Sequence, residues 1–465
     1  MKGNRRTGLA LAIPLGVILA VLVSSGRGID KVGAAPQEIY EDLETFTNVL
    51  AIIQKNYVEP TDPKKLIEGA INGMLTSLDP HSAYLTPELY KELQVETKGS
   101  FGGLGIEITN RSGMLMVVSP IEDTPASRAG IKAQDVILKI DGDFTKDMTL
   151  VDAVKKMRGP KGTKVKLTIR RENPPKLLDV TLTREVIKIQ SVKYRLLEGG
   201  YGYLRLTQFQ ERTDDDVLKA LREMEKESGG LQGLVLDLRN NPGGLLTQAV
   251  KVSDIFLDSG LIVYTDGRLE NQKQKYFAHK ASTWSDFPMV VLVNGGSASA
   301  SEIVAGALQD HKRALVLGTT TFGKGSVQTI LPLDDTSALR LTTARYFTPS
   351  GRSIQATGIV PDIAMEQSTA QGKAEKQGAL LREANLPGHL VHPPDDKDKA
   401  KDGDKAEVVP AVEEETPDGP VPTDLPLDDP NVQEGELGKD PQLDRALELL
   451  KSWQVFKTFV AKREE

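Results

Sequence analysis

The chain has 465 residues, enough for several domains, and its 58 basic and 65 acidic residues give a net charge of -7. This balance, with no dominant basic patch, argues against a general nucleic-acid binder, so no nucleic-acid partner is expected. The sequence contains no cysteine, which excludes disulfides, thiolate zinc sites and a cysteine nucleophile. Its five histidines show no metal-binding helical spacing, and we expect neither a metal nor a cofactor.

The N-terminus has the pattern of an export signal. Lys2, Arg5 and Arg6 precede an apolar run over residues 9–23, and small residues follow. Residues 1–35 are therefore predicted to be a signal peptide or an N-terminal membrane anchor. The basic flank would stay in the cytoplasm and the rest of the chain would face the periplasm. The sequence leaves open whether this segment is cleaved or retained.

Changes in hydrophobic period divide the remaining chain. Apolar residues recur at helical spacing over residues 36–98, short alternating strands fill 99–187, and strands alternate with helices over 188–365. Residues 366–439 form a charged, proline-rich, low-complexity linker that we expect to be disordered. The amphipathic helix predicted at 440–465 needs a partner surface for its apolar face. The predicted fold class is therefore a multidomain α/β protein.

Residues 317–328, LGTTTFGKGSVQ, contain a glycine-lysine motif similar to a phosphate-binding loop. A P-loop has a hydroxyl residue directly after its lysine and a helix after the loop. Here Gly325 follows Lys324, and the β-branched residues after it predict a strand. A glycine-rich turn with a solvated lysine and a catalytic lysine remain as interpretations, and this stretch alone does not separate them.

Two further strand ends carry candidate catalytic groups. The sequence pattern over residues 290–308 predicts a buried strand, a Gly-Gly turn and a helix that starts near Ser299. Such a corner can present a serine hydroxyl beside the first N–H groups of a helix. Ser299 and Glu302 also form an S-x-x-E capping box, which needs no catalytic role. Residues 236–244, LDLRNNPGG, suit either a close approach of backbone to a ligand or an ordinary turn.

A serine nucleophile needs a base to take its proton. His311 ends the helix that Ser299 begins, and His279 lies in a polar loop, so a Ser-His-Asp triad is not expected. A lysine can serve if burial lowers its pKa enough to leave a neutral amine. Lys324, flanked by glycines and followed by Gln328, is the best candidate base.

Together these motifs resemble the carboxy-terminal processing proteases, which use a Ser-Lys dyad. The resemblance spans residues 78–363 and rests on FGGLGIEI, LDLRNNPGG, NGGSASASE and FGKGSVQ in the order of the family. It implies a crotonase/ClpP-like α/β protease core in which Ser299 is the nucleophile, Lys324 the general base and Gln328 the group that holds the lysine. The implied oxyanion hole combines the N–H of Ala300 with that of one of two glycines, Gly243 or Gly244.

The glycine-rich segment that begins at residue 99 resembles a PDZ domain. Its carboxylate-binding loop falls on four residues whose successive N–H groups can hold a terminal carboxylate: Gly103, Leu104, Gly105 and Ile106. The neighbouring strand can accept an extended peptide. Whether this domain activates or inhibits the protease is left open.

The resemblance implies an exported serine endopeptidase that recognises protein C-termini and cleaves envelope or periplasmic proteins. Some members of the family also need a lipoprotein adaptor, and the apolar stripes of the terminal helices predict a homo-oligomer. One alternative is a catalytically inactive PDZ scaffold in the cell envelope, although Ser299, Lys324 and Gln328 are all present. An NTP-dependent enzyme is the other alternative, and it would require nucleotide binding.

Overall fold

The computed structural model describes residues 37–366, apart from 112, 147, 173–174 and 282, together with 382–391 and 435–464. The predicted export signal at 1–35 and most of the predicted linker at 366–439 lie outside these residues. No helix among the described residues is long and apolar enough to cross a membrane. The chain divides into two compact units, Met1–Ile71 and Asn72–Glu465, which are described separately.

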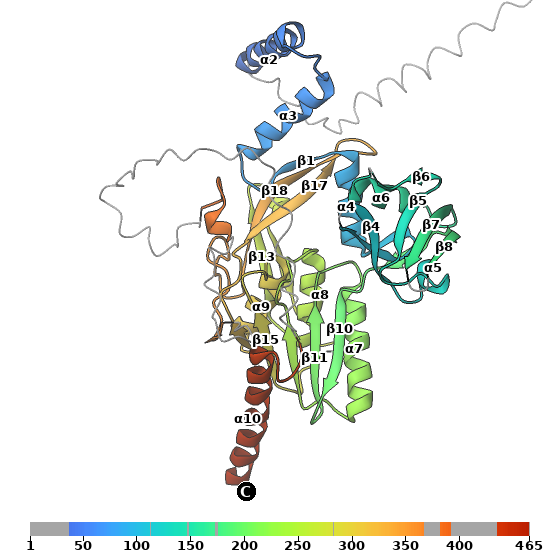
Figure 1. Ribbon diagram of the computed structural model, residues 1–465. Helices are drawn as coiled ribbons and strands as arrows, with labels where there is room; N and C mark the ends of the chain where they lie inside the picture. The colour runs from blue at the N-terminus through green and yellow to red at the C-terminus, as the bar shows by residue number, and fades with distance from the viewer. Residues whose placement is uncertain are drawn as a thin grey trace, which may run out of the picture. The chain divides into compact units, whose positions relative to one another are not determined.

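The first unit contains helix α2 (Gln37–Asn56) and the first part of α3 (Pro63–Thr76) (Figure 1, blue). The apolar residues of α2 recur every three or four positions, which places them along one side of a helix. They are between 44% and 61% exposed: Ile39, Tyr40, Leu43, Phe46, Val49 and Ile52. The helix therefore presents an uncovered apolar stripe.

The second unit begins with the end of α3, strand β1 (Ala83–Leu85) and helix α4 (Pro87–Lys98). The Thr86 hydroxyl caps the N-terminus of α4, and Gly99 ends it in the left-handed conformation. The chain then enters β2 (Ser100–Gly103), which pairs antiparallel with β9 (Glu185–Lys188). These two paired strands lie at the beginning and the end of the predicted PDZ segment.

The PDZ segment is a six-stranded antiparallel sheet with two short helices. Its strand order is β3-β4-β5-β7-β8, with β6 paired to β5. Alternate residues of these strands and of the helices bury one core, which includes Leu115, Ile137 and Leu167. The elements are β3 (Ile106–Arg111), β4 (Met114–Pro120), α5 (Pro125–Arg128), β5 (Val136–Ile140), β6 (Asp143–Phe144), α6 (Leu150–Met157), β7 (Lys164–Glu172) and β8 (Pro175–Thr183).

The protease core is built on a six-stranded sheet in the order β10-β11-β12-β15-β16-β19. Strand β10 is antiparallel to β11, and the other neighbours run parallel. The strands are β10 (Val192–Leu197), β11 (Tyr201–Leu206), β12 (Gly233–Asp237), β15 (Met289–Val293), β16 (Leu315–Gly318) and β19 (Ile363–Ala364).

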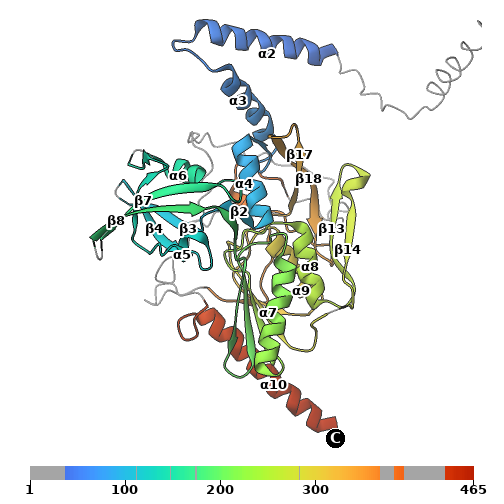
Figure 2. The ribbon, with the colours of Figure 1, turned by 90° about the vertical axis from the view of Figure 1, so that its right-hand side faces the viewer.

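Helices cover both faces of this sheet, which explains why β12 and β15 are continuous apolar runs (Figures 1 and 2). Leu234, Leu236 and Val291 face α7 (Thr213–Ser228), α8 (Leu246–Phe256) and α9 (Ala300–Asp310). Val235 and Val290 face α10 (Pro441–Glu464) on the other side. The predicted alternation of strands and helices in this region is confirmed.

A second, antiparallel sheet contributes to the same core. Its order is β1-β18-β13-β14, and β17 also pairs with β18. The strands are β13 (Leu261–Gly267), β14 (Gln274–Phe277), β17 (Ser326–Pro332) and β18 (Ala338–Phe347). Strand β17 thus follows the glycine-lysine motif, as predicted. Because a phosphate-binding loop is followed by a helix, this motif does not have the geometry of such a loop. Two short 3-10 turns complete the described elements, at Glu270–Gln272 and Glu383–Asn385.

The apolar face of α10 packs within its own chain over the first half of the helix. Leu443, Ala446, Leu447 and Leu450 are buried against the sheet. The second face of the sheet thus supplies the partner surface that this apolar face was expected to need. Further along α10, Trp453 and Phe456 are exposed.

Candidate active site

The parallel strands bring the predicted catalytic motifs to one edge of the core sheet. Strands β12, β15 and β16 are neighbours and run in the same direction, so their carboxyl ends lie side by side. LDLRNNPGG continues from β12, NGGSASASE from β15 and TTTFGKG from β16. The carboxyl edge of a parallel sheet is where α/β proteins usually bind ligands.

Ser299 occupies a strained corner immediately before α9. It has φ 54° and ψ -111°, although positive φ is rare for a residue with a side chain. Its neighbours Ala298 and Ala300 are buried, whereas Ser299 is only partly buried. Strain of this kind persists where the surrounding structure holds it in place, often at functional sites. The corner thus leaves one serine accessible at the start of a helix.

Hydrogen bonds join the Ser299 corner to the loop that follows β12. The Ser297 hydroxyl donates to the Leu238 carbonyl at 2.8 Å. The Asn241 carbonyl accepts from the Ala298 N–H at 3.0 Å and from the Ser301 hydroxyl at 2.9 Å. These hydrogen bonds therefore hold the two loops against each other.

The two candidate oxyanion-hole glycines have different surroundings. A Cβ on Gly243 would lie 2.9 Å from the Ala300 nitrogen and 2.9 Å from the Ser299 Cβ, so this glycine lies directly against the corner. Its N–H donates to the Asn241 side chain at 2.9 Å. Across the described part of the chain, no hydrogen bond is found from the N–H of Gly244 or of Ala300. Both N–H groups can therefore donate to a ligand at this corner.

Glu302 is a fully buried carboxylate that connects the serine and lysine loops. It accepts from the Ser299 N–H at 2.8 Å, as the capping box predicts. It also accepts from the Lys324 N–H at 2.9 Å, the Gly323 N–H at 2.8 Å and the Thr321 hydroxyl at 2.5 Å. Burial raises the pKa of Glu302 to about 7, and these hydrogen bonds act against that rise. The sequence reveals the cap but not the connection to Lys324.

Lys324 has the depressed pKa that a lysine base requires. Burial lowers the pKa of its amine to about 8, and the positive charge of Arg340 acts in the same direction. The acidic groups nearest to it, Glu383, Glu302 and Asp79, act in the opposite direction. No hydrogen bond between the Lys324 amine and the Ser299 hydroxyl is found among the described residues. Catalytic hydrogen bonds often tighten only when substrate binds.

Among the described residues, no hydrogen bond is found between the Gln328 side chain and the Lys324 amine. Its amide donates to the Ser326 hydroxyl at 3.0 Å and to the Thr342 hydroxyl at 3.4 Å. The β17–β18 register shifts between Val327 and Gln328, and such a bulge redirects the side chains beside it. The sequence spacing of four residues could not show this bulge.

Tyr346 is a buried residue at the site that the sequence analysis missed. Its hydroxyl donates to the Lys324 carbonyl and lies within hydrogen-bonding reach of the Ser299 side chain. Burial raises the pKa of Tyr346 well above its ordinary value, so the phenol stays protonated. It comes from β18, a strand that we did not single out, and no local motif marks it.

The predicted carboxylate-binding loop lines a small cavity of about 80 Å³ in the PDZ segment. Gly103, Leu104, Gly105 and Ile106 form one wall, and α6 contributes Val154 and Met157. Strand β3 is an edge strand paired only with β4, so its outer edge is open to an added peptide strand. Gly105 has φ 75°, and a Cβ there would lie 2.3 Å from Thr124. The geometry therefore needs glycine at this position.

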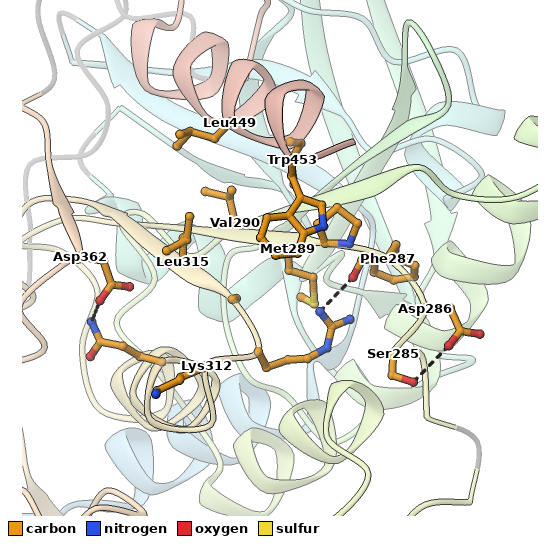
Figure 3. A pocket seen from close by; sticks show the side chains of 15 residues that line it. Ser285, Asp286, Phe287, Met289, Val290, Lys312, Leu315, Asp362, Leu449 and Trp453 are labelled. Atoms are coloured by element: carbon orange, nitrogen blue, oxygen red, sulfur yellow. Dashed lines mark hydrogen bonds between the residues drawn. The ribbon is translucent and has the colours of Figure 1, made fainter. Parts of the chain in front are cut away.

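A separate cavity of about 910 Å³ lies beside α10, at the amino ends of β15 and β16 (Figure 3). The serine corner follows the carboxyl end of β15. Leu449 and Trp453 of α10 face Val290 and Leu315 across it. Arg313 donates to the Phe287 carbonyl at 2.9 Å in its wall. None of the candidate catalytic residues lines this cavity.

Comparison with known families gives three matches along the chain. The model for peptidase family S41 matches residues 200–365, that for the PDZ domain matches 102–182, and that for the activating protease CtpB N-terminal domain matches 23–88. These matches define a serine peptidase that carries a PDZ domain.

Individual relatives agree with the family models. A carboxy-terminal-processing protease of Bartonella bacilliformis is 51% identical over 356 residues, covering 76% of this chain and 82% of the relative. The carboxy-terminal processing protease CtpA of Bacillus subtilis is 39% identical over 315 residues, covering 68% and 67%. The solved photosystem II D1 C-terminal processing protease is 33% identical, with a TM-score of 0.40 and coverage of 69% and 92%. The chain belongs to the carboxy-terminal processing proteases of peptidase family S41.

Proposed function

We propose that Ser299 and Lys324 form the catalytic dyad of this serine endopeptidase. The supporting observation is the buried Glu302 carboxylate, which accepts from the backbone N–H groups of both residues at 2.8 and 2.9 Å. One fixed group thereby sets the separation of the serine and the lysine. With a pKa of about 8, about a tenth of the amine is neutral at pH 7, against less than a thousandth for an ordinary lysine.

The reaction follows from these positions. The neutral Lys324 amine removes the hydroxyl proton as Ser299 Oγ attacks the scissile carbonyl carbon. The N–H groups of Ala300 and Gly244 then donate to the developing oxyanion, while Gly243 keeps the loop close to the corner. The lysine passes the proton to the leaving amine, and water hydrolyses the acyl-enzyme by the same route. The Gln328 NH₂ group donates to Ser326 and Thr342, so its carbonyl oxygen is the atom that would accept from the lysine amine.

The pH dependence of cleavage tests the lysine assignment. Because the deprotonated amine is the active form, kcat should rise with pH through a midpoint near 8, far below the 10.5 of an ordinary lysine. A serine-reactive probe followed by peptide mapping should label Ser299 and should fail to label Ser299→Ala. A modified peptide without Ser299 would overturn the assignment.

The PDZ segment is proposed to select substrates by their free C-terminus. The loop of Gly103 to Ile106 lies at the start of the open edge strand β3, where a terminal carboxylate and an extended peptide can bind together. An apolar peptide acid should bind more tightly than its C-terminal amide in calorimetry. Equal affinities would show that the pocket reads something other than the carboxylate.

Export to the periplasm is proposed from the basic residues and apolar run at 1–35, which lie outside the described residues. A reporter that is active only in the cytoplasm, fused after Glu465, should be silent. Activity of that reporter would contradict export.

Self-association is proposed from the exposed apolar stripe of α2. Replacing Leu43 and Phe46 by Glu should lower the mass measured by light scattering. An unchanged mass would mean that the stripe is free for another protein, such as a lipoprotein adaptor.

A further inference from the structure

Arg239 is a fully buried cation at the end of β12, between the sheet and the start of α10. Its guanidinium donates to Asp237 from Nε at 3.0 Å and from Nη2 at 2.7 Å. It donates to Asp440 from Nη1 at 3.0 Å and from Nη2 at 2.6 Å, and to the Gln442 side chain from Nη1 at 2.9 Å. These contacts use all the N–H groups that an arginine side chain has.

The two carboxylates that hold Arg239 are themselves fully bonded. Asp237 also accepts from the Tyr203 hydroxyl at 2.8 Å and from the Arg239 N–H at 3.0 Å. Asp440 also accepts from the N–H groups of Gly435 at 2.8 Å and Leu443 at 3.1 Å. A buried charge is tolerated only when it is paired and hydrogen-bonded in this way. Each member of the network therefore depends on the others.

The network lies directly before the loop that contacts Ser299. Leu238 and Asn241 bind the serine corner through their carbonyl groups, as described above. Asn240 adds a bond to the same corner, because the Asn294 side chain accepts from its N–H at 2.9 Å. A movement of Arg239 would thus be transmitted to the loop that carries Gly243 and Gly244.

We propose that Asp440 and Gln442, at the start of α10, are positioning residues for the peptidase reaction. They fix Arg239, and through it they fix the loop that places the Gly243–Gly244 backbone against Ser299. Neither residue touches substrate. This inference rests on the proposed roles of Ser299 and the glycine backbone.

A simpler role for α10 would be to cover the sheet. Its apolar residues Leu443, Ala446, Leu447 and Leu450 belong to the hydrophobic cluster on that face of the sheet. The two roles predict different kinetic behaviour. Weaker packing of α10 on the sheet should lower stability alone. Loss of the contact between Asp440 and Arg239 should also lower kcat, because a small displacement of catalytic groups has a large effect on rate.

The test compares full-length variants on one peptide substrate. Asp440→Asn should lower kcat about 10- to 100-fold with KM nearly unchanged, and PDZ affinity for a peptide acid should stay at the wild-type value. Gln442→Ala, which removes a single neutral partner, should lower kcat about threefold, a fraction of that effect. Glu448→Gln is the matched control, because Glu448 is an exposed carboxylate on the same helix.

Leu447→Ala tests the packing of α10 on the sheet without changing the residues that hold Arg239. It should lower the unfolding temperature and leave kcat at 25 °C close to wild type. The proposal is overturned if Asp440→Asn folds and retains wild-type kcat, or if Leu447→Ala loses as much kcat as Asp440→Asn. If Asp440→Asn does not fold, wild-type kcat in Gln442→Ala overturns it. Cleavage by Ser299→Ala would instead contradict the proposed dyad, so the two failures are distinguishable.

Discussion

The candidate active site and the PDZ pocket both suit an extended peptide, but different physical means hold them in shape. Buried ionisable groups hold the active site, where Glu302 and Arg239 are each fully buried and hydrogen-bonded to several partners. The PDZ pocket depends on backbone N–H groups, apolar walls and a tight glycine at Gly105. Its cation, Arg158, lies at the pocket wall over the Phe101 ring at 4.5 Å. Catalysis should therefore be lost when a buried ionisable group is replaced. Peptide binding by the PDZ pocket should be weakened when an added side chain fills the pocket.

Removing the nucleophile or the base should have the largest effect and should affect the active site alone. Ser299→Ala and Lys324→Arg should each reduce kcat by about 10⁴-fold or more, because a guanidinium stays protonated and cannot accept the hydroxyl proton. Combining Ser299→Ala with Lys324→Ala should add little. The measurement is cleavage of a peptide acid, with calorimetric peptide affinity as the control. Near wild-type cleavage by Lys324→Ala would return this lysine to the solvated-turn interpretation.

Replacing the lysine should also stabilise the fold. The folded-state pKa of Lys324 lies near 8 and the unfolded value near 10.5, so below pH 8 the folded state bears the full cost of a buried charge. Lys324→Met should raise the free energy of unfolding by up to about 3 kcal/mol at pH 7. The gain should shrink as pH rises from 8 and vanish above 10.5, where the amine is neutral in both states. Denaturant unfolding at pH 7 and pH 10 measures it, and a gain that is equal at both values would contradict the assigned charge cost.

Removing an acceptor oxygen of Glu302 should weaken the active site next. Glu302→Gln turns an NH₂ group toward backbone N–H donors, which leaves donors unpaired and should lower kcat about 30-fold, or about 2 kcal/mol. Peptide affinity of the PDZ segment should not change. Glu227→Gln, at an exposed carboxylate of α7, is the matched control. Wild-type kcat in Glu302→Gln would restrict this residue to helix capping.

The smallest effect should come from filling space in the PDZ pocket. Gly105→Ala should weaken peptide binding about tenfold, because its Cβ would meet Thr124 at 2.3 Å. Gly113→Ala is a close control, since Gly113 also has φ 75° but nothing lies within 4 Å of its Cβ position. Cleavage of a short peptide that does not need the PDZ segment should be normal in both. Equal binding losses would mean that backbone strain, and not space, decides the result.

The sequence was sufficient for the parts of the site that depend on local motifs and on the chemistry of single residues. A serine nucleophile needs a base, and this need together with the family resemblance was enough to pair Ser299 with Lys324. The Ser299–Glu302 capping box was also visible as a local pattern.

The remaining features arise from contacts between residues far apart in the sequence. The bulge before Gln328 depends on pairing with β18, and the proposed choice of Gly244 rests on the bond from the Gly243 N–H to the Asn241 side chain. Arg239 and Asp440 are separated by 201 positions, and neither local sequence indicates the other. Composition and periodicity carry no signal for such contacts.

The contact between Arg239 and α10 also bears on when the protein becomes active during its synthesis. The chain is made from its N-terminus, so Ser299 and Lys324 emerge well before Asp440. If Asp440 is needed to fix the loop that carries Gly243 and Gly244, an unfinished chain carries both proposed catalytic residues but has little activity. Peptidase activity would then begin only with the finished chain, and prematurely terminated products would do little damage to neighbouring proteins.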